Sequence, residues 1–177
     1  MIAVMGTTMA VIPVEEYLST SFSDGDREYL DGQVAERNVG EFNHADIQTA
    51  IAFYLRTHDK TCWAVVECRM MITRTRYRIP DVCLGLGPKP KGGPLVDPPF
   101  LAVEVLSPDD RLAQMEDKIR DYLACGVKYV WVVNPESQSA VVHTSEGSKD
   151  VADGILRTEN PSIELPLSAI FEQPWSR

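Results

Sequence analysis

Two carboxylates stand where the sequence otherwise predicts hydrophobic strands. Asp81 lies in the segment Ile79-Pro80-Asp81-Val82, and Glu104 lies in the segment Ala102-Val103-Glu104-Val105. Acidic residues are depleted in strands and are rarely buried without a partner, so two of them in core-like strands need a common explanation. Carboxylate oxygens are hard ligands that bind Mg²⁺ or Mn²⁺ and leave positions open for water and phosphate. The simplest hypothesis is a divalent metal site. The alternative is that Asp81 caps a turn and Glu104 pairs with an arginine.

A polar triplet lies on the apolar side of the first long helix, which is expected from Glu41 to about Thr57. At helical spacing His44 falls near the centre of the apolar face, with Glu41 one turn earlier and Gln48 one turn later. Polar groups aimed at a sheet can position water or orient a metal ligand. His44 and Glu41 are therefore candidate catalytic residues. One alternative is that His44 is a hydrogen-bonded core residue. The other is that Glu36, in the preceding hairpin, is the site acid in place of Glu41.

Three arginines precede Asp81. Arg74, Arg76 and Arg78 share one face if their segment is a strand. Guanidinium groups that lead to a metal site are suited to contacts with the phosphate backbone of a nucleic acid. The alternative is an exposed edge strand that is protected by its charges.

The elements that must position these residues alternate between strands and helices. A hairpin is expected where Asp31-Gly32 supplies the positive backbone angles of a tight turn, and β-branched and aromatic residues predict the strands that follow the first helix. These elements are the hairpin at Glu28–Glu36 and the strands at Trp63–Glu67, Cys68–Thr73, Tyr77–Gly85 and Phe100–Leu106.

The second half of the chain begins with a strong helix-start signal. In Ser107-Pro108-Asp109-Asp110 the serine can cap, the proline suits the first helical position and the acids favour the positive end of the helix dipole; Gly126 is typical of a helix end. A hairpin of Lys128–Val133 and Ala140–Thr144 and a short helix near Leu167–Phe171 follow. We expect a single mixed α/β domain over residues 1–177, with a central mixed β-sheet flanked by helices and about the first twelve residues disordered.

Composition restricts the function further. The formal net charge of −9 argues against a protein that coats nucleic acid, because such binding depends on neutralising phosphates. A local site remains compatible with this charge if a metal offsets its carboxylates. The four cysteines have no paired metal spacing, which favours reduced thiols and a cytoplasmic location. No segment has the roughly 20 apolar residues of a membrane span, and the opening residues lack the charges of a secretory signal.

The chain resembles the Uma-two family of restriction-type endonucleases in the PD-(D/E)XK superfamily. The resemblance runs from the hairpin at Tyr29 to Phe171 and depends on the order of several short motifs. These are Asp81 after Pro80, the block Val103-Glu104-Val105-Leu106-Ser107-Pro108, then Lys118, Tyr122, Gly126-Val127 and Tyr129-Val130-Trp131-Val132-Val133-Asn134-Pro135.

This resemblance implies a restriction-endonuclease-like fold and a Mg²⁺ ion held by Asp81, Glu104 and the backbone carbonyl of Val105. The superfamily places a lysine two residues after the glutamate, where this chain has Leu106. The lysine is expected instead to come from Lys118, which projects at the border of the apolar helix face and can extend toward the carboxylates. The alternative is that Lys118 is a solvated surface lysine. The resemblance also implies that Tyr122 contacts substrate.

Two functions from different classes follow. The first is a metal-dependent endonuclease that hydrolyses DNA and, by the habit of the superfamily, works as a homodimer. The second is a catalytically silent relative that binds DNA or a protein partner as a regulator, for which Leu106 and the acidic charge balance are the arguments.

Overall fold

The computed structural model describes residues 11–23, 25–37, 41–58, 61–108 and 110–172. The expectation of disorder over the first residues falls mostly on residues 1–10, which lie outside this range. Val11 and Ile12 are described and are ordered against the first hairpin, since Val11 forms a β-bridge with Gln33 and the Ile12 N–H donates to the Gly32 carbonyl at 3.0 Å.

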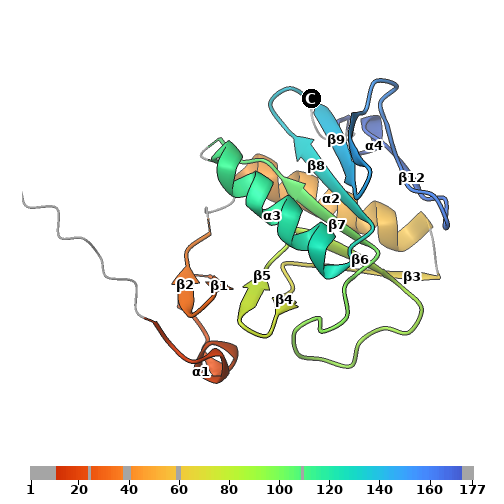
Figure 1. Cartoon of the computed structure of the whole chain (residues 1–177). Coiled ribbons are helices and arrows are strands. Elements are labelled where there is room, and N and C mark those ends of the chain that lie inside the picture. Colours follow the sequence, from red (N-terminus) through yellow and green to blue (C-terminus); the bar gives the residue numbers. More distant parts are fainter. Residues whose placement is uncertain (1–10, 24, 38–40, 59–60, 109, 173–177) are drawn as a thin grey trace, which may run out of the picture.

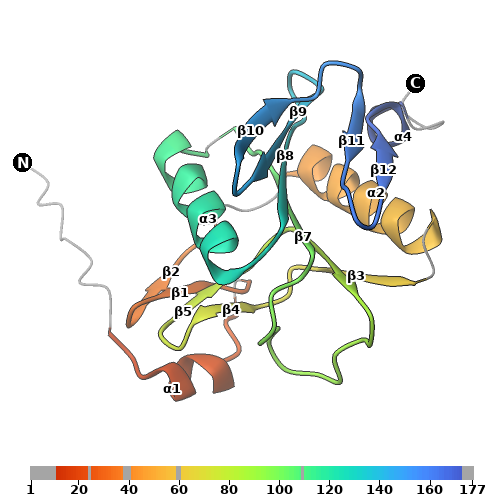
Figure 2. The same ribbon diagram turned by 45° about the vertical axis from the view of Figure 1, so that its right-hand side comes forward.

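A six-stranded mixed sheet forms the centre of the molecule, with helices on both faces, as the sequence predicted. Only β7 and β8 are parallel, and the other neighbouring strands are antiparallel. The two long helices, α2 (Phe42–His58) and α3 (Leu112–Cys125), lie on opposite sides of this sheet (Figures 1 and 2). The strand order is β10 (Gly147–Asp150), β9 (Ser139–Thr144), β8 (Tyr129–Asn134), β7 (Leu101–Val105), β6 (Val82–Leu86) and β3 (Cys62–Val66).

A smaller second sheet contains the predicted N-terminal hairpin. Asp31 and Gly32 have φ angles of 53° and 98°, as the tight turn requires. Tyr17 of the short helix α1 stacks on Tyr29 with ring centroids 4.9 Å apart and so anchors α1 to this sheet. The strand order is β2 (Gln33–Ala35), β1 (Glu28–Leu30), β5 (Arg76–Arg78) and β4 (Met70–Thr73), and α1 spans Val14–Ser19.

The chain passes from the small sheet to the central sheet at Asp81. The sequence prediction of one strand over Tyr77–Gly85 is wrong, because β5 ends at Arg78 and β6 begins at Val82. Pro80 between them has no N–H to donate to a ladder and has a fixed φ, which suits a break. Asp81 is thus held at the junction of two sheets and not within a strand.

The arginine stripe is corrected in the same region. Arg74 and Thr75 form the turn between β4 and β5, so the three arginines do not share one continuous strand. Arg74 is exposed, whereas Arg78 is only 6% exposed. The alternation of charged and uncharged residues over positions 74–78 therefore covers a tight turn and the strand that follows it.

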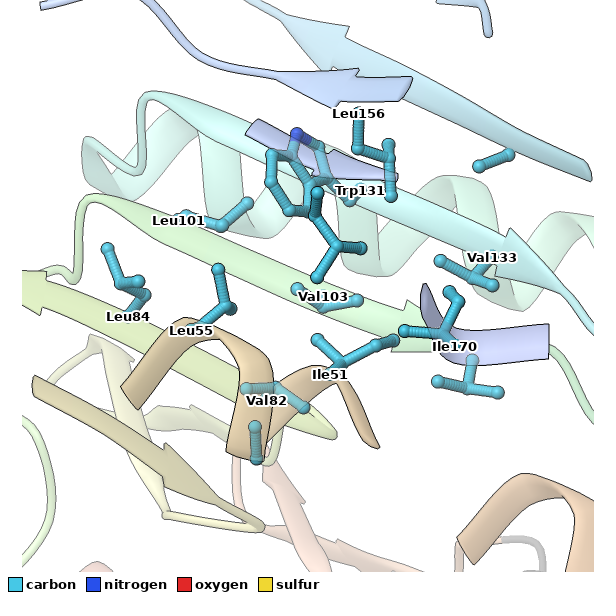
Figure 3. Close-up of a cluster of buried hydrophobic side chains, with 14 of the residues drawn as sticks. Ile51, Leu55, Val82, Leu84, Leu101, Val103, Trp131, Val133, Leu156 and Ile170 are labelled. Carbon is cyan, nitrogen blue, oxygen red and sulfur yellow. The ribbon is translucent and has the colours of Figure 1, made fainter. Parts of the chain in front are cut away.

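The α2 face of the central sheet is an apolar core. Ile51 and Leu55 of α2 point toward the strands and meet Val103, while Trp131 extends from β8 toward Leu156 (Figure 3). Each of these five side chains is at most 2% exposed. The C-terminal part of the chain adds to this core from β11 (Ile155–Arg157), β12 (Glu164–Pro166) and α4 (Ser168–Phe171).

The α3 helix begins later than its sequence signal predicted. Its first residue is Leu112 and its N-cap is Arg111. The segment from Ser107 instead closes on itself, because the Ser107 N–H donates to the Asp110 carboxylate at 2.6 Å and the Asp110 N–H donates to the Ser107 carbonyl at 3.0 Å. Asp109, part of the same prediction, lies outside the described residues. The helix end at Gly126 is confirmed by a φ of 111°.

The other predicted elements are confirmed. The β8–β9 hairpin and α4 form where the pattern placed them, and α2 covers the predicted range. Among the residues that the structure describes, no helix has the length and apolar character needed to cross a bilayer.

Candidate active site

Glu104 reaches the α3 face of the sheet through the alternation of β7. Leu101, Val103 and Val105 point into the apolar core beneath α2, so Ala102 and Glu104 point to the other side. Glu104 is 1% exposed there. A buried carboxylate of this kind needs donors from its neighbours, and α3 supplies them.

Two side chains of α3 contact the two oxygens of Glu104. The Lys118 ammonium donates to Oε2 at 2.8 Å, and the Tyr122 hydroxyl donates to Oε1. Lys118 and Tyr122 are four residues apart, so they lie one helical turn apart on the same face. The family resemblance implied a lysine that extends from this helix to a carboxylate, and Lys118 has this position; its side chain is 19% exposed.

Asp81 is held by donors from three other places in the chain. Its Oδ1 lies 3.0 Å from Nη2 of Arg37 and 3.4 Å from Nε2 of His44. Its Oδ2 accepts from the backbone N–H of Val105 at 2.7 Å, and its backbone carbonyl accepts from the Gln48 amide at 3.0 Å. The bond to Val105 fixes the carboxylate beside the end of β7, next to Glu104.

The two carboxylates line one cavity of about 370 Å³. The small sheet and its hairpin form one wall of this cavity, and the start of α3 forms another. Ser107 lies in the wall and its hydroxyl is 3.2 Å from Nδ1 of His44, which leaves Nε2 of the same ring to face Asp81. The cavity therefore brings together Asp81, Glu104, Lys118, His44 and Val105, five of the residues singled out from the sequence; their roles remain predictions.

A third acid, Glu28, lies in the cavity wall and was not found from the sequence. It is 4% exposed, and its Oε1 is 3.8 Å from the Lys118 ammonium. Its Oε2 lies 2.7 Å from Arg78, and Arg78 also contacts Asp121 of α3 at 2.7 Å. The sequence signal that could have identified Glu28 was an acid on the first strand of the hairpin, beside the apolar Tyr29.

The surroundings shift the pKa values of the two central carboxylates in opposite directions. Burial raises the pKa of Glu104 to about 7, against the opposing charge of Lys118 and with a further contribution from Asp81. Burial would also raise the pKa of Asp81, but the hydrogen bonds from His44 and Val105 and the charge of His44 hold that pKa below its usual value. Asp81 is therefore ionised near neutral pH, and Glu104 titrates there.

Two of the basic groups in contact with these acids, Lys118 and His44, have pKa values shifted toward their charged forms. Burial alone would lower the pKa of Lys118, but the charges of Glu104 and Glu28 raise it above its usual value. The hydrogen bond to Asp81 raises the pKa of His44 against the effect of burial. A charged Lys118 donates hydrogen bonds and does not accept a proton.

The other predicted residues differ in whether they reach the cavity. Glu41 is exposed and does not line the cavity. Arg76 is engaged by Asp31 and Asp121, and Arg78 is buried in its ion pairs, so the two arginines stabilise the wall of the site. Tyr122 is fully buried behind Glu104 and not in the cavity wall, a position in which it orients the carboxylate. Glu36 does line the cavity, although it is exposed.

The donor set fits a small divalent cation. Within the described residues no group of three or more histidine, cysteine, aspartate or glutamate side chains is arranged to hold a metal ion. Mg²⁺ does not need such a cage, because it commonly binds one or two carboxylates and keeps several waters. Asp81 and Glu104 provide two such carboxylates side by side in a cavity with room for water and phosphate.

Two comparisons relate the chain to known proteins. The chain matches the model of the family Uma2, described as "Putative restriction endonuclease", over residues 14–172. It is also similar in structure to a crystal structure described as a putative nuclease belonging to DUF820 from Anabaena variabilis, with a TM-score of 0.77, 19% sequence identity and coverage of 91% of this chain and 98% of that chain. This second likeness shows the fold. No curated protein matches the chain.

Proposed function

Because the chain belongs to the Uma2 family of restriction-endonuclease-like proteins, we propose that it is a metal-dependent endonuclease that hydrolyses phosphodiester bonds in DNA. The observation that carries this proposal is the convergence of Asp81, Glu104 and Lys118 on one cavity. Two carboxylates beside one ammonium group are what hydrolysis of a phosphodiester requires, since the acids attract a cation and the ammonium group stabilises negative charge that develops on phosphate.

The Asp81 and Glu104 carboxylates would hold Mg²⁺ or Mn²⁺. When bound, such an ion supplies Lewis acidity toward a phosphate oxygen and lowers the pKa of water. The backbone carbonyl of Val105 is the further ligand that the family resemblance suggests.

The side chains of the protein would divide the remaining work. Lys118, charged and anchored between Glu104 and Glu28, would donate to the attacking water or to a phosphate oxygen. His44 and Tyr122 orient the two carboxylates from opposite sides. The apolar core beneath α2 holds β7 rigidly, so that Glu104 and the Val105 N–H keep their positions.

The test is cleavage of supercoiled plasmid DNA by purified protein in Mg²⁺ or Mn²⁺. We expect nicking by the wild type and a loss of at least about 100-fold in Asp81→Asn and in Glu104→Gln, each of which removes a ligand charge. Asp153→Asn is the matched control, because Asp153 is an exposed acid that does not line the cavity. Cleavage that persists in both cavity variants would refute the proposal, as would the absence of metal-dependent cleavage under all conditions.

Two further features belong to this proposal. The free thiols of Cys68, Cys83 and Cys125 support a reducing, cytoplasmic environment. A homodimer would allow two cavities to act on the two strands of a duplex. Light scattering of the purified protein would reveal the dimer.

A further inference from the structure

Arg37 is placed among the acids of the cavity, although nothing in the sequence pattern marked it. It follows β2, lines the cavity and has a side chain that is only 16% exposed. Its Nη2 is 3.0 Å from Oδ1 of Asp81, and its Nη1 is 3.6 Å from Oε1 of Glu67. A guanidinium thus lies against the carboxylate on which the metal site depends.

The three arginine and lysine side chains in the cavity wall are held differently. Arg78 has two carboxylate partners at 2.7 Å, and Lys118 has Glu104 at 2.8 Å. Arg37, by contrast, shares its Asp81 oxygen with His44 and has a longer contact with Glu67, which is half exposed. Of these three cations Arg37 is therefore the one that can leave its carboxylate at the lowest cost.

We propose that Arg37 is a resident cation at Asp81 that a divalent ion displaces, and that the freed guanidinium then binds a phosphate oxygen of the substrate; this inference rests on the proposed function. A guanidinium and a metal ion repel each other at contact distance, so the two cannot occupy Oδ1 of Asp81 together. Arg37 would remain in the cavity after displacement, because the negative charge of Glu67 is beside it.

The chemistry of the guanidinium group suits this second position. Its planar fork matches two oxygens of a phosphate, and it keeps its charge at any pH at which the protein folds. The exchange also balances charge. Without metal, Arg37 neutralises the buried Asp81 carboxylate. With metal and DNA bound, the metal ion faces the carboxylates and the Arg37 guanidinium faces a phosphate. Binding of metal and binding of DNA would then be coupled through one side chain.

The inference makes Arg37 act on metal and on DNA with opposite signs. Removal of its charge in Arg37→Gln should tighten Mn²⁺ binding without DNA by roughly five- to tenfold, within the usual range of coupling between competing ligands. The same variant should bind a fluorescein-labelled DNA duplex several-fold more weakly in Ca²⁺, which carboxylate oxygens bind as they do Mg²⁺. Calorimetry measures the first effect and fluorescence anisotropy measures the second.

Two further variants separate this role from simple structural support. Arg37→Lys keeps the charge but not the fork, so its Mn²⁺ affinity should stay near that of the wild type while its DNA affinity falls. Arg157→Gln, at an exposed arginine of β11 outside the cavity, should change neither value. Thermal unfolding of each variant establishes that it is folded.

The outcomes distinguish the inference from the function it rests on. Equal Mn²⁺ affinity in the wild type and Arg37→Gln, or weaker affinity in the variant, would overturn the inference and leave the metal site in place. Failure of both proteins to bind Mn²⁺ would overturn the metal site and the inference together. Unchanged DNA affinity in Arg37→Gln would overturn the second half, in which the guanidinium binds phosphate.

Discussion

Both faces of the central sheet are buried and carry an apolar cluster, but β7 presents different side chains to the two faces. On the α2 face, β7 presents Leu101, Val103 and Val105, each at most 1% exposed, to an apolar cluster. On the α3 face the same strand presents Glu104, also 1% exposed, to an ammonium and a hydroxyl group. Burial alone therefore does not distinguish a core from a site.

The difference between the faces lies in how each group is compensated. Apolar side chains gain stability simply by leaving water, at about 25 cal/mol for each Å² that is buried. A carboxylate loses its hydration and recovers it only through donors in fixed positions. The α2 face is thus suited to stability, whereas the α3 face holds a charge in a state that a cation and a substrate can use.

The largest effect is expected from a substitution in the apolar core on the α2 face. Ile51→Ala should lower the free energy of unfolding by about 2–5 kcal/mol, because it leaves a cavity at a fully buried position. Urea denaturation measures this value, and the Mn²⁺ affinity of the folded protein should remain unchanged. Phe53→Ala is the matched control on the same helix, since Phe53 is 69% exposed. A loss as large in the control would show that the effect does not come from core packing.

A substitution of a polar residue on the α3 face should change activity more than stability. Lys118→Met keeps the length of the side chain but removes the ammonium group, and DNA cleavage should fall by about 100- to 1,000-fold. Lys128→Met, at an exposed lysine outside the cavity, should retain activity. Initial cleavage rates at saturating Mn²⁺ measure both. If Lys118→Met kept activity within a few-fold of the wild type, the ammonium group would have no part in the reaction.

The raised pKa of Glu104 gives an effect that depends on pH. The folded protein binds this proton more tightly than the unfolded chain, so the contribution of Glu104 to stability is present at low pH and declines as pH rises from about 4.5 to about 7. Glu104→Gln has no such proton. Its stability relative to the wild type should therefore rise across this window by on the order of 3 kcal/mol.

Urea denaturation at several pH values, with a chelator present, measures that difference. Groups that titrate alike in both proteins cancel in the comparison. A stability difference between the two proteins that stays constant from pH 4.5 to 8 would mean that the pKa of Glu104 is not raised.

The sequence predicted the site where a local pattern carried the information. Glu104 stood out as an acid in an apolar strand. The helical angle of Lys118 relative to Met115 and Tyr122 allowed either a lysine that reaches the sheet or a solvated lysine, and the family resemblance favoured the first. The mixed sheet with a helix on each face followed from the order of the elements. These features depend on residues close together in the chain or on strict periodicity.

Other features depend on contacts between distant segments, and the sequence did not reveal them. Arg37 lies 44 residues from Asp81, in a polar segment without periodicity, so nothing local marked it. The crossing between sheets at Pro80 was read as one strand because residues on both sides of it favour strands. The start of α3 was missed because the side chain of Asp110 bonds back to Ser107 and competes with the helix for the backbone.

The most direct test of the central claim is a crystal soaked in Mn²⁺ and measured for anomalous scattering. A peak in the cavity within about 2.0–2.3 Å of one oxygen from Asp81 and one from Glu104, with the Arg37 guanidinium withdrawn from Asp81, is the expected result. A cavity without a peak at saturating Mn²⁺, or a peak bound by only one of these carboxylates, would contradict the claim that the two acids form one metal site.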